Sequence, residues 1–369
     1  MMRMGIIRFT ISTIALILNL VVVILYLIAM LSGWVSPTRA HMPAFLNLAF
    51  PIILFLMAVA LIVNLLLRRW SYFVIYLFLF LLGSKYILTY FPLHTGNSLQ
   101  EERDLRVMTY NVMNFGERDQ EDGLPLAVKV ILDYDPDIIA LQEGLNVKSS
   151  KGGGWSIKSL LGRRYKYVHF STFKGQTLFS KYPILVAEPI EYESYRNNGS
   201  VALLIQLPSD QKVMVVNNHM ESYSLKNNEL MKYKDYVTDI DITHTWGNFQ
   251  EVKQRLGPDL KARAKAANKV NSEAKRLREQ WQPDMEIILG DFNDTPMSYT
   301  YTKLRGDLDD AIAETGWGLS PTFIDAPLRF RIDHILYGGA LEAIGSKIPK
   351  RREASDHYPL IVDFRYKTK

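Results

Sequence analysis

The sequence predicts an α/β domain with mixed β-sheets, preceded by three membrane-spanning helices. Two observations support this fold class. Residues 9–84 consist largely of long apolar stretches, whereas residues 104–369 alternate strand-like apolar runs with helical patterns. Some connections between these runs are short enough for hairpins and others are long enough for a crossover helix, which predicts both antiparallel and parallel strand pairs.

Near the amino terminus, three stretches contain no Asp, Glu, Lys or Arg: residues 9–38, 42–67 and 71–84. Each of the first two is long enough to cross about 30 Å of hydrocarbon as a helix. The third continues past Lys85 as far as Phe91, and a lysine near a helix end can extend its ammonium group to the membrane surface. A cleaved signal peptide has a shorter apolar core, and the helices of a soluble bundle would show a polar face. We therefore predict a membrane domain of three transmembrane helices over residues 1–94.

Basic residues in the short loops predict the orientation of these helices. Arg3 and Arg8 precede the first helix, and Arg68 and Arg69 lie between the second and the third. The loop between the first and the second contains only Arg39. Because cytoplasmic loops carry the excess of basic residues, the amino terminus is expected in the cytoplasm. Three crossings then put everything after the membrane domain in the periplasm or outside the cell.

Composition excludes some function classes and leaves others open. The 369-residue chain has a formal net charge of +5, with both signs interspersed, which does not indicate a nucleic-acid-binding surface. The absence of cysteine fits an oxidising exterior and fits the cytoplasm equally well. The apolar stretches contain no acid and only Lys85 as a base, which argues against a charged transport pathway.

A polar linker over residues 95–103 precedes the second domain, residues 104–369. Strands are predicted near residues 105–111, 137–142, 165–170, 184–190, 200–207, 212–218, 286–290, 331–337 and 357–364. Helices are predicted near residues 123–133 and 259–281. Residues 175–183 are interpreted as a strand end followed by a turn, because Pro183 cannot donate a hydrogen bond to a sheet.

Six short polar motifs end or follow apolar runs in the second domain. In chain order they are Thr109-Tyr110-Asn111, Leu141-Gln142-Glu143, Asn218-His219, Gly290-Asp291-Phe292-Asn293, Arg331-Ile332-Asp333-His334 and Ser355-Asp356-His357. Each motif alone would more often be a turn, a cap or a surface feature. Six of them at strand ends can converge on one edge of a sheet, and they predict a catalytic centre.

The residue types suit hydrolysis of a phosphoester, which needs a cation, a base for water and donors around the phosphoryl oxygens. Glu143 follows a buried strand, where a carboxylate is a suitable ligand for a hard cation. Asp291 and Asn293 are two residues apart, so an extended backbone points both side chains to the same side. Asp291 can orient or deprotonate water, and the Asn293 amide can donate to a phosphoryl oxygen.

In order and chemistry, the six motifs resemble the endonuclease/exonuclease/phosphatase superfamily, the deoxyribonuclease I-like group, over roughly residues 103–365. The resemblance implies a four-layered sandwich of two mixed β-sheets flanked by helices. It also implies that Asn111, Glu143 and Asp356 form the metal site. Mg²⁺ is the expected cofactor, and Mn²⁺ is an alternative because hard oxygen ligands suit both ions.

The same resemblance assigns catalytic roles to His219, Asp291, Asn293, Asp333 and His357. Asp333 is expected to hydrogen-bond to His357, which fixes the tautomer and raises the basicity of the imidazole. His219 is expected to stabilise the transition state or to assist the leaving oxygen. Either His357 or Asp291 is the general base, and the sequence leaves both open. His334 is expected to point to the opposite side of its strand, away from the site.

Residues 221–283 form an insertion relative to the smallest members of that superfamily, and the insertion starts near the mouth of the site. The predicted helix within it, over residues 259–281, has an apolar face made of Leu260, Ala264, Ala267, Ala274 and Leu277. Its basic residues are Lys261, Arg263, Lys265, Lys269, Lys275 and Arg276. We interpret these as a solvated face rather than as a phosphate-binding stripe, because charged helix faces usually contact water.

The sequence therefore predicts a membrane-anchored, metal-dependent phosphohydrolase that acts outside the cytoplasm. Its expected partners are membrane lipids and a phosphorylated, lipid-linked substrate, either an ester or a diphosphate. This arrangement resembles the VanJ-type membrane members of the superfamily, which implies a bacterial inner membrane. Two alternatives stay open: an extracytoplasmic nuclease with nucleic acid as its substrate, and a non-catalytic membrane-anchored binding or scaffold domain. No protein partner is predicted.

Overall fold

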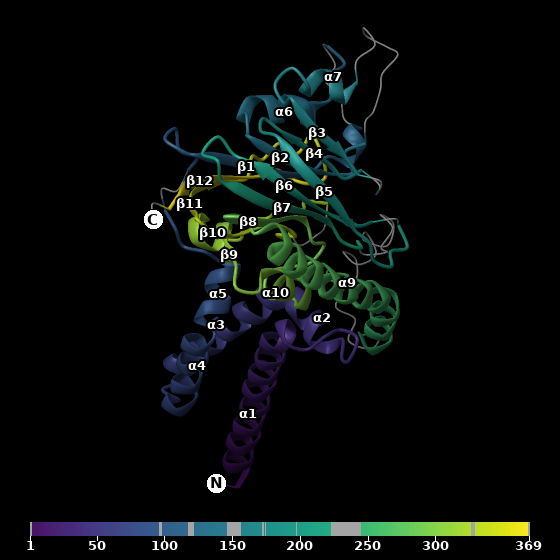
Figure 1. Ribbon diagram of the computed structural model, residues 1–369. Coiled ribbons are helices and arrows are strands. Elements are labelled where there is room, and N and C mark those ends of the chain that lie inside the picture. Colours follow the sequence, from purple (N-terminus) through teal and green to yellow (C-terminus); the bar gives the residue numbers. More distant parts are fainter. Residues whose placement is uncertain are drawn as a thin grey trace.

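The computed structural model consists of two β-sheets packed face to face, with helices on both outer faces and a group of apolar helices at one end (Figure 1). It describes residues 2–95, 98–116, 122–145, 156–171, 173, 175–196, 198–222, 245–325 and 329–367, without the side chains of residues 2–9, 11 and 245–253. The expectation of two mixed sheets flanked by helices is confirmed. Parts of the predicted linker and insertion, residues 96–97 and 223–244, lie outside the described residues.

The first sheet has the strand order β11-β12-β1-β2-β4-β3. Its strands are β1 (Leu105–Asn111), β2 (Ile138–Gln142), β3 (Tyr167–Phe170), β4 (Thr177–Ser180), β11 (Leu341–Lys347) and β12 (Leu360–Tyr366). Strands β1 and β2 are parallel, and the other neighbours are antiparallel. The carboxyl ends of β1 and β2 therefore lie at the same edge of the sheet, where β12 begins.

The second sheet repeats this arrangement, with the strand order β5-β6-β7-β8-β10-β9. Its strands are β5 (Ile184–Ile190), β6 (Ser200–Gln206), β7 (Lys212–His219), β8 (Met285–Asp291), β9 (Asp309–Asp310) and β10 (Asp333–Gly339). Here β7 and β8 form the parallel pair, and β10 runs antiparallel to β8. The ends of β7 and β8 and the beginning of β10 consequently meet at one edge.

Alternating side chains along the central strands contact different layers, as expected for strands buried on both faces. In β8, Ile287 and Leu289 pack into the core between the two sheets. Ile288 points the other way and packs with Ala267 and Val270 of α9. The four layers are therefore held together by three apolar interfaces, one between the sheets and one between each sheet and its helices.

Helices form the two outer layers of this sandwich (Figure 1). The first sheet is covered by α6 (Leu126–Tyr134) and α7 (Ile157–Leu161), whose apolar side chains pack on β1, β2 and β4. The second sheet is covered by α9 (Thr245–Trp281) and α10 (Tyr299–Arg305). The shorter helices are α11 (Ala311–Thr315) and the 3₁₀ turns η1 (Leu31–Gly33) and η2 (Met113–Phe115).

Most predicted strands agree with the structure, and the differences lie at edges and ends. Strands β10 and β12 begin at Asp333 and Leu360, two to three residues later than predicted. The edge strands β9 and β11 are absent from the prediction, because β9 is very short and β11 contains polar residues and Gly345. Helix α9 starts at Thr245 rather than near residue 259, because the helix continues through Pro258.

The apolar amino-terminal part also differs from three continuous helices. It contains α1 (Met2–Met30), α2 (Met42–Leu48), α3 (Phe50–Leu66), α4 (Trp70–Leu82) and α5 (Ser84–Tyr90). By length and composition, the segment Ser12–Gly33 can cross a membrane by itself. The pair α2 and α3 is bent by 74°, and the pair α4 and α5 by 61°. Pro51 in the first turn of α3 and Gly83 between α4 and α5 account for these breaks, because neither residue favours an uninterrupted helix.

The amino-terminal helices pack directly onto the segment that follows β8 (Figure 1). Ser32 Oγ donates to the carbonyl oxygen of Met297 at 2.7 Å, and Asn47 Nδ2 donates to Thr295 Oγ1 at 2.9 Å. Met297 itself packs among apolar side chains of the helices, including Phe50. On another side, Arg331 donates to the carbonyl oxygen of Thr89. The helices and the sandwich are therefore joined by buried contacts as well as by the chain.

Candidate active site

Three of the expected site residues lie opposite one another in the second sheet. At the end of the parallel pair, His219 of β7 is in register with Asp291 of β8, and Asp291 is in register with Asp333 of β10. Gly290, in β8, lies opposite Asn218 of β7. It has φ +123°, and a Cβ there would collide with the backbone oxygen of Asn218. Only glycine fits this close approach, which explains the first residue of the Gly-Asp-Phe-Asn motif.

The first sheet contributes Asn111 and Glu143. Asn111 is the last residue of β1, and Glu143 directly follows β2, the parallel neighbour of β1. Asn111 Nδ2 donates to Asp291 Oδ2 at 3.1 Å and lies 3.5 Å from Glu143 Oε1. Asn114 Nδ2 donates to the other oxygen, Glu143 Oε2, at 3.4 Å. The amide of Asn111 thus connects a carboxylate of each sheet, and it joins the two edges into one site.

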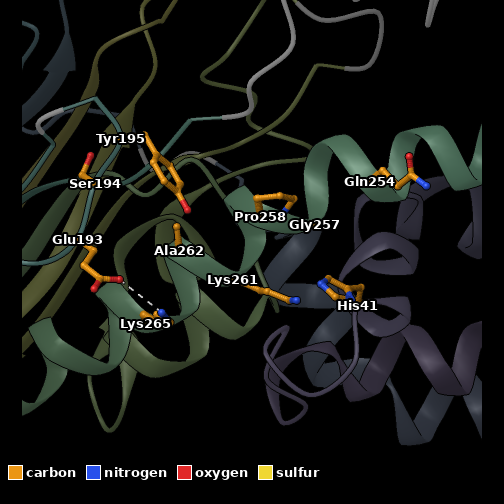
Figure 2. Close-up of a pocket in the computed structure, with 10 residues that line it drawn as sticks. All are labelled: His41, Glu193, Ser194, Tyr195, Gln254, Gly257, Pro258, Lys261, Ala262 and Lys265. Atoms are coloured by element: carbon orange, nitrogen blue, oxygen red, sulfur yellow. Dashed lines mark hydrogen bonds and ion pairs between the residues drawn. The ribbon is translucent and has the colours of Figure 1, made fainter.

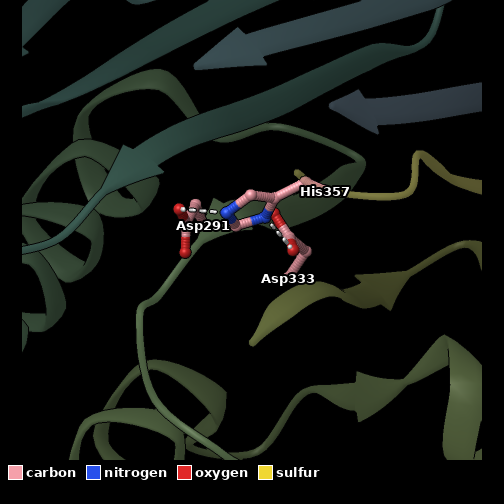
Figure 3. A group of neighbouring side chains, drawn as sticks. All are labelled: Asp291, Asp333 and His357. Atoms are coloured by element: carbon pink, nitrogen blue, oxygen red, sulfur yellow. Dashed lines mark hydrogen bonds and ion pairs between the residues drawn. The ribbon is translucent and has the colours of Figure 1, made fainter. Parts of the chain in front are cut away.

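The imidazole of His357 lies between two buried carboxylates (Figure 3). Its Nδ1 is 2.8 Å from Asp333 Oδ2, so the pairing expected from the sequence is present. Its Nε2 is 3.8 Å from Asp291 Oδ2. His219 Nε2 is 3.9 Å from both Asp291 Oδ2 and Glu143 Oε1. One carboxylate, Asp291, therefore faces two imidazoles and an amide.

Burial and charge set the protonation of this group. Burial opposes the charged form of His357, but the neighbouring carboxylates of Asp333 and Asp291 outweigh that effect and raise the pKa of the imidazole. Burial, followed by the charge of Asp333, raises the pKa of the Asp291 carboxyl. The other oxygen of Asp333, Oδ1, is buried without a hydrogen-bond partner among the described residues.

The donor set fits a hard divalent cation. Glu143 keeps about a third of its side chain exposed, at 32%, and offers carboxylate oxygens at the open side of the site. Asn111 turns Nδ2 toward this carboxylate while its Oδ1 accepts from the Met113 N–H, so its amide would have to turn over to add an oxygen ligand. Ligand atoms of Asp291, Asp333 and His357 also lie within 4.8 Å of one another. A cation between Asp333 and His357 would have to replace their 2.8 Å hydrogen bond, so the side of Glu143 fits better.

Two expected site residues make other contacts in this structure. The carboxylate of Asp356 accepts a hydrogen bond from Ser355 Oγ at 3.2 Å, and in the described part of the chain it is not paired with Glu143 or Asn111. The side-chain amide of Asn293 donates to the backbone oxygen of Met220 at 3.1 Å. Its backbone N–H donates to Asp291 Oδ1 at 2.8 Å. Asn293 therefore holds the Asp291 carboxylate through its backbone.

Arg263 corrects the interpretation of the basic residues on α9 as a solvated face. Its side chain is fully buried, with Nη1 donating to the backbone oxygen of Glu221 at 2.8 Å and Nε 3.7 Å from Asp294 Oδ2. The guanidinium thus connects α9 to the segments after β7 and β8. The helical period already indicates this position, because Arg263 is three residues from Leu260 and four from Ala267, both on the apolar face.

Two further buried residues, His334 and Arg331, belong to the same motif as Asp333 but lie outside the site. His334 lies on the far side of β10, between the rings of Phe292 at 4.9 Å and Tyr301 at 5.0 Å. It was expected to point away from Asp333, and it does. Arg331, to which the sequence assigned no role, pairs with buried Asp310 at 3.4 Å.

Known proteins with a similar sequence or structure share this fold. Residues 108–357 match the model of the Endonuclease/Exonuclease/phosphatase family, and residues 12–90 match a domain of unknown function. The human Nocturnin catalytic domain, solved with a bound sulfate anion, has a TM-score of 0.50 and 17% identity, covering 71% of this chain and 94% of its own.

An endonuclease/exonuclease/phosphatase family protein from Bacteroides thetaiotaomicron has a TM-score of 0.50 and 16% identity, covering 72% of this chain and 98% of its own. Among curated proteins, none matches the sequence. The family match spans more than half of the chain and contains Asn111, Glu143, Asp291 and His357. The chain therefore belongs to the endonuclease/exonuclease/phosphatase family, whose members are hydrolases that act on phosphoester bonds.

Proposed function

We propose that this protein is a membrane-anchored, divalent-metal-dependent phosphohydrolase that cleaves a phosphoester or diphosphate of a lipid-linked substrate. The observation that carries the proposal is the position of the site relative to the apolar helices. Asp291 and Asn293 are followed within a few residues by Thr295 and Met297, which contact those helices directly. A substrate held in the membrane surface would therefore be close to the site.

The proposed division of the chain into domains is consistent with a membrane anchor. Residues 1–94 form a membrane domain, residues 95–103 a linker and residues 104–369 the catalytic domain, with an insertion at about 221–283. Up to three spans result if each bent helix pair crosses the membrane as a unit. An odd number of spans separates the amino terminus from the catalytic domain, which then faces the periplasm or the cell exterior, as in the VanJ-type members that the chain resembles.

Each side chain of the site has a task in phosphoester hydrolysis. Asp291 accepts the proton of the attacking water, because its Oδ1 is held by a backbone N–H and its Oδ2 lies among the amide and imidazole groups of the site. His357, held at Nδ1 by Asp333, donates from Nε2 to a phosphoryl oxygen. His219 lies beside Asp291 and Glu143 and stabilises the leaving oxygen.

Glu143 with Asn111 would hold a divalent cation such as Mg²⁺ or Mn²⁺, which when bound would supply positive charge against the negative charge that develops on the phosphoryl group. Asp356 lies beside His357 in the sequence, and its charge contributes to the raised pKa of that imidazole. We propose that Asp356 is an outer member of the metal site rather than a contact of Glu143.

The first experiment measures hydrolysis by the full chain in detergent micelles, using a lipid diphosphate, a phospholipid and DNA as parallel substrates. We expect release of phosphate from a lipid substrate with Mg²⁺ and none with a chelator. His357→Ala is expected to abolish turnover, and Glu143→Gln to raise the Mg²⁺ concentration required. His169→Ala in β3 and Glu342→Gln in β11 are the matched controls, since both lie outside the site.

The outcomes separate the proposal from its alternatives. Cleavage of DNA alone would make the protein a nuclease. If a folded protein cleaves none of the substrates and its affinity for Mg²⁺ is the same with and without Glu143→Gln, it is a binding or scaffold domain. Equal loss of activity in His169→Ala would mean that the histidine substitutions act through folding.

A further inference from the structure

A polar cavity of about 330 Å³ lies where the apolar segment Ser12–Gly33 ends. Three separate parts of the chain line it: the loop that leads from α1 to α2, the middle of α9 and helix α10. Its lining residues are Trp34, Ser36, Thr38, Arg39, Asn268, Tyr299 and Lys303. None of them belongs to the cluster around Asp291 and His357, so the cavity is separate from the candidate active site.

The loop and α10 are held together by close packing. A Cβ at Gly33 would lie 2.5 Å from Thr302 Oγ1, so glycine permits the end of the apolar segment to contact α10. Ser32 Oγ donates to the Met297 carbonyl oxygen in the turn before α10. The cavity is therefore a feature of the folded junction.

The charge of the cavity is positive. Arg39 and Lys303 both line it, and there is no Asp or Glu among the described residues that do so. Lys303 Nζ lies over the ring of Tyr299, 5.3 Å from its centroid, instead of pairing with an acid. Two cations facing one cavity repel each other, and an anion between them removes that cost.

A neighbouring cavity of about 850 Å³ provides a contrast (Figure 2). It is lined by His41 from the same loop, by Lys261 and Lys265 of α9 and by Glu193. There the acid is already paired, because Glu193 Oε2 lies 3.4 Å from Lys265 Nζ. Its positive charge is partly balanced by the protein, whereas the Arg39 and Lys303 cavity has no acid among its described lining residues.

Neutral donors complete the smaller cavity. Ser36 Oγ and Thr38 Oγ1 are 2.9 Å apart, so one hydroxyl can donate to the other and the second can donate into the cavity. Tyr299 OH donates to Asn268 Oδ1 at 3.0 Å, which orients the amide. Two cations with hydroxyl and amide donors are the groups that recognise a phosphate.

The position of the cavity, next to the end of the apolar segment, indicates the source of that phosphate. Trp34 directly follows the apolar segment, is 72% exposed and donates from Nε1 to Tyr86 OH at 3.2 Å. Trp and Tyr side chains near the end of an apolar helix are typical of the headgroup level of a membrane. We propose that this cavity binds the phosphate of an anionic phospholipid headgroup, as a site distinct from the catalytic one.

This inference rests on the membrane anchoring included in the proposed function, and its test separates the two. Anchoring is checked first, by resistance of the full chain to alkaline extraction from membranes. The full chain in a neutral detergent is then titrated with short-chain phosphatidylglycerol, short-chain phosphatidylcholine and inorganic phosphate. We expect phosphatidylglycerol to bind most tightly and to raise the thermal unfolding midpoint.

Arg39→Gln with Lys303→Gln should weaken phosphatidylglycerol binding by roughly 25-fold, since each basic residue at a membrane surface contributes roughly fivefold. Lys303→Arg keeps the charge and should bind normally, which controls for packing at α10. Lys261→Gln with Lys265→Gln, in the larger cavity, removes the same charge and should leave binding unchanged.

Three results would overturn the proposal. One is unchanged phosphatidylglycerol affinity in the Arg39 and Lys303 variant, provided that this variant unfolds at the temperature of the parent without lipid. Another is loss of affinity in the Lys261 and Lys265 variant instead. The third is equal affinity for inorganic phosphate, which would indicate a site for free anions. Release from the membrane at alkaline pH would instead contradict the anchoring.

Discussion

The hydrogen bond between His357 Nδ1 and Asp333 Oδ2 joins an imidazole and a carboxylate that are both buried. Asp333→Asn preserves the shape of the side chain and removes its charge. We expect the turnover number to fall by roughly 10²–10⁴-fold, because the imidazole loses the group that orients it and stabilises its charged form. Initial rates on the substrate identified above provide the measurement.

Asp309→Asn, in the short edge strand β9, is the matched control, since Asp309 is exposed. It should retain the activity of the parent. Parent-like activity of Asp333→Asn, with an unchanged circular dichroism spectrum, would show that the pair does not take part in the reaction.

His334 provides a prediction about stability and pH. Burial, followed by the charge of Arg331, lowers the pKa of its imidazole from 6.5 to about 4. Between these two values the unfolded chain binds a proton that the folded chain does not. Stability is therefore unaffected above pH 6.5 and decreases as pH falls toward 4, by at most about 1.4 kcal/mol per pH unit.

His334→Gln is expected to weaken this dependence, because glutamine can donate to the Asp294 carbonyl oxygen, 3.0 Å from His334 Nε2, without titrating. Thermal unfolding midpoints at pH 7 and pH 5 test the prediction for both proteins. The change between the two pH values should be smaller in the variant, and an equal change would contradict the assigned pKa.

At the scale of elements, α2 is attached to the segment after β8 through Asn47. Its Nδ2 donates to Thr295 Oγ1 at 2.9 Å and to the Pro296 carbonyl oxygen at 3.3 Å, and the side chain is buried. Asn47→Ala should destabilise the protein by about 1–3 kcal/mol, because buried polar groups lose their partner. Activity should fall as well, since the same segment begins at Asn293.

Asn64→Ala is the matched control within the apolar helices. Asn64 is also buried, but its amide donates to Asn19 Oδ1 at 2.7 Å and to the Ala60 carbonyl oxygen at 2.8 Å, far along the chain from the site. We expect a similar loss of stability with activity per folded molecule unchanged. Equal loss of that activity in both variants would show that α2 has no special link to the site.

For the whole molecule, the junction predicts that the sandwich depends on the amino-terminal helices. Removal of residues 1–97 would expose Met297 and would take away the Thr89 carbonyl that accepts from Arg331. The Arg331 and Asp310 pair, 1% and 0% exposed, would lose part of its cover. We expect the shortened chain to be less stable by at least ~2 kcal/mol and to aggregate.

Thermal unfolding of the shortened and full chains measures this difference. Met297→Ser in the shortened chain should reduce aggregation, because it removes apolar surface from the exposed junction. A shortened chain as stable and as soluble as the full chain would mean that the helices serve only as an anchor.

Local patterns were sufficient for much of the fold. Alternating apolar residues predict the central strands, and long uncharged stretches predict the helices that precede them, because both signals can be recognised from neighbouring residues along the chain. The breaks at Pro51 and Gly83 and the edge strand β11 were missed. Their patterns are weak, and packing against neighbouring elements decided them.

The sequence by itself determined which polar residues stand at strand ends, and from their order it indicated a phosphoester-cleaving site. Only the tertiary structure decided that His219, Asp291 and Asp333 lie opposite one another, that Arg263 is buried, and that the apolar helices contact the segment after Asn293. The physical reason is that side-chain spacing is a local property. Strand register and the docking of one layer on another depend on contacts between residues far apart in the chain.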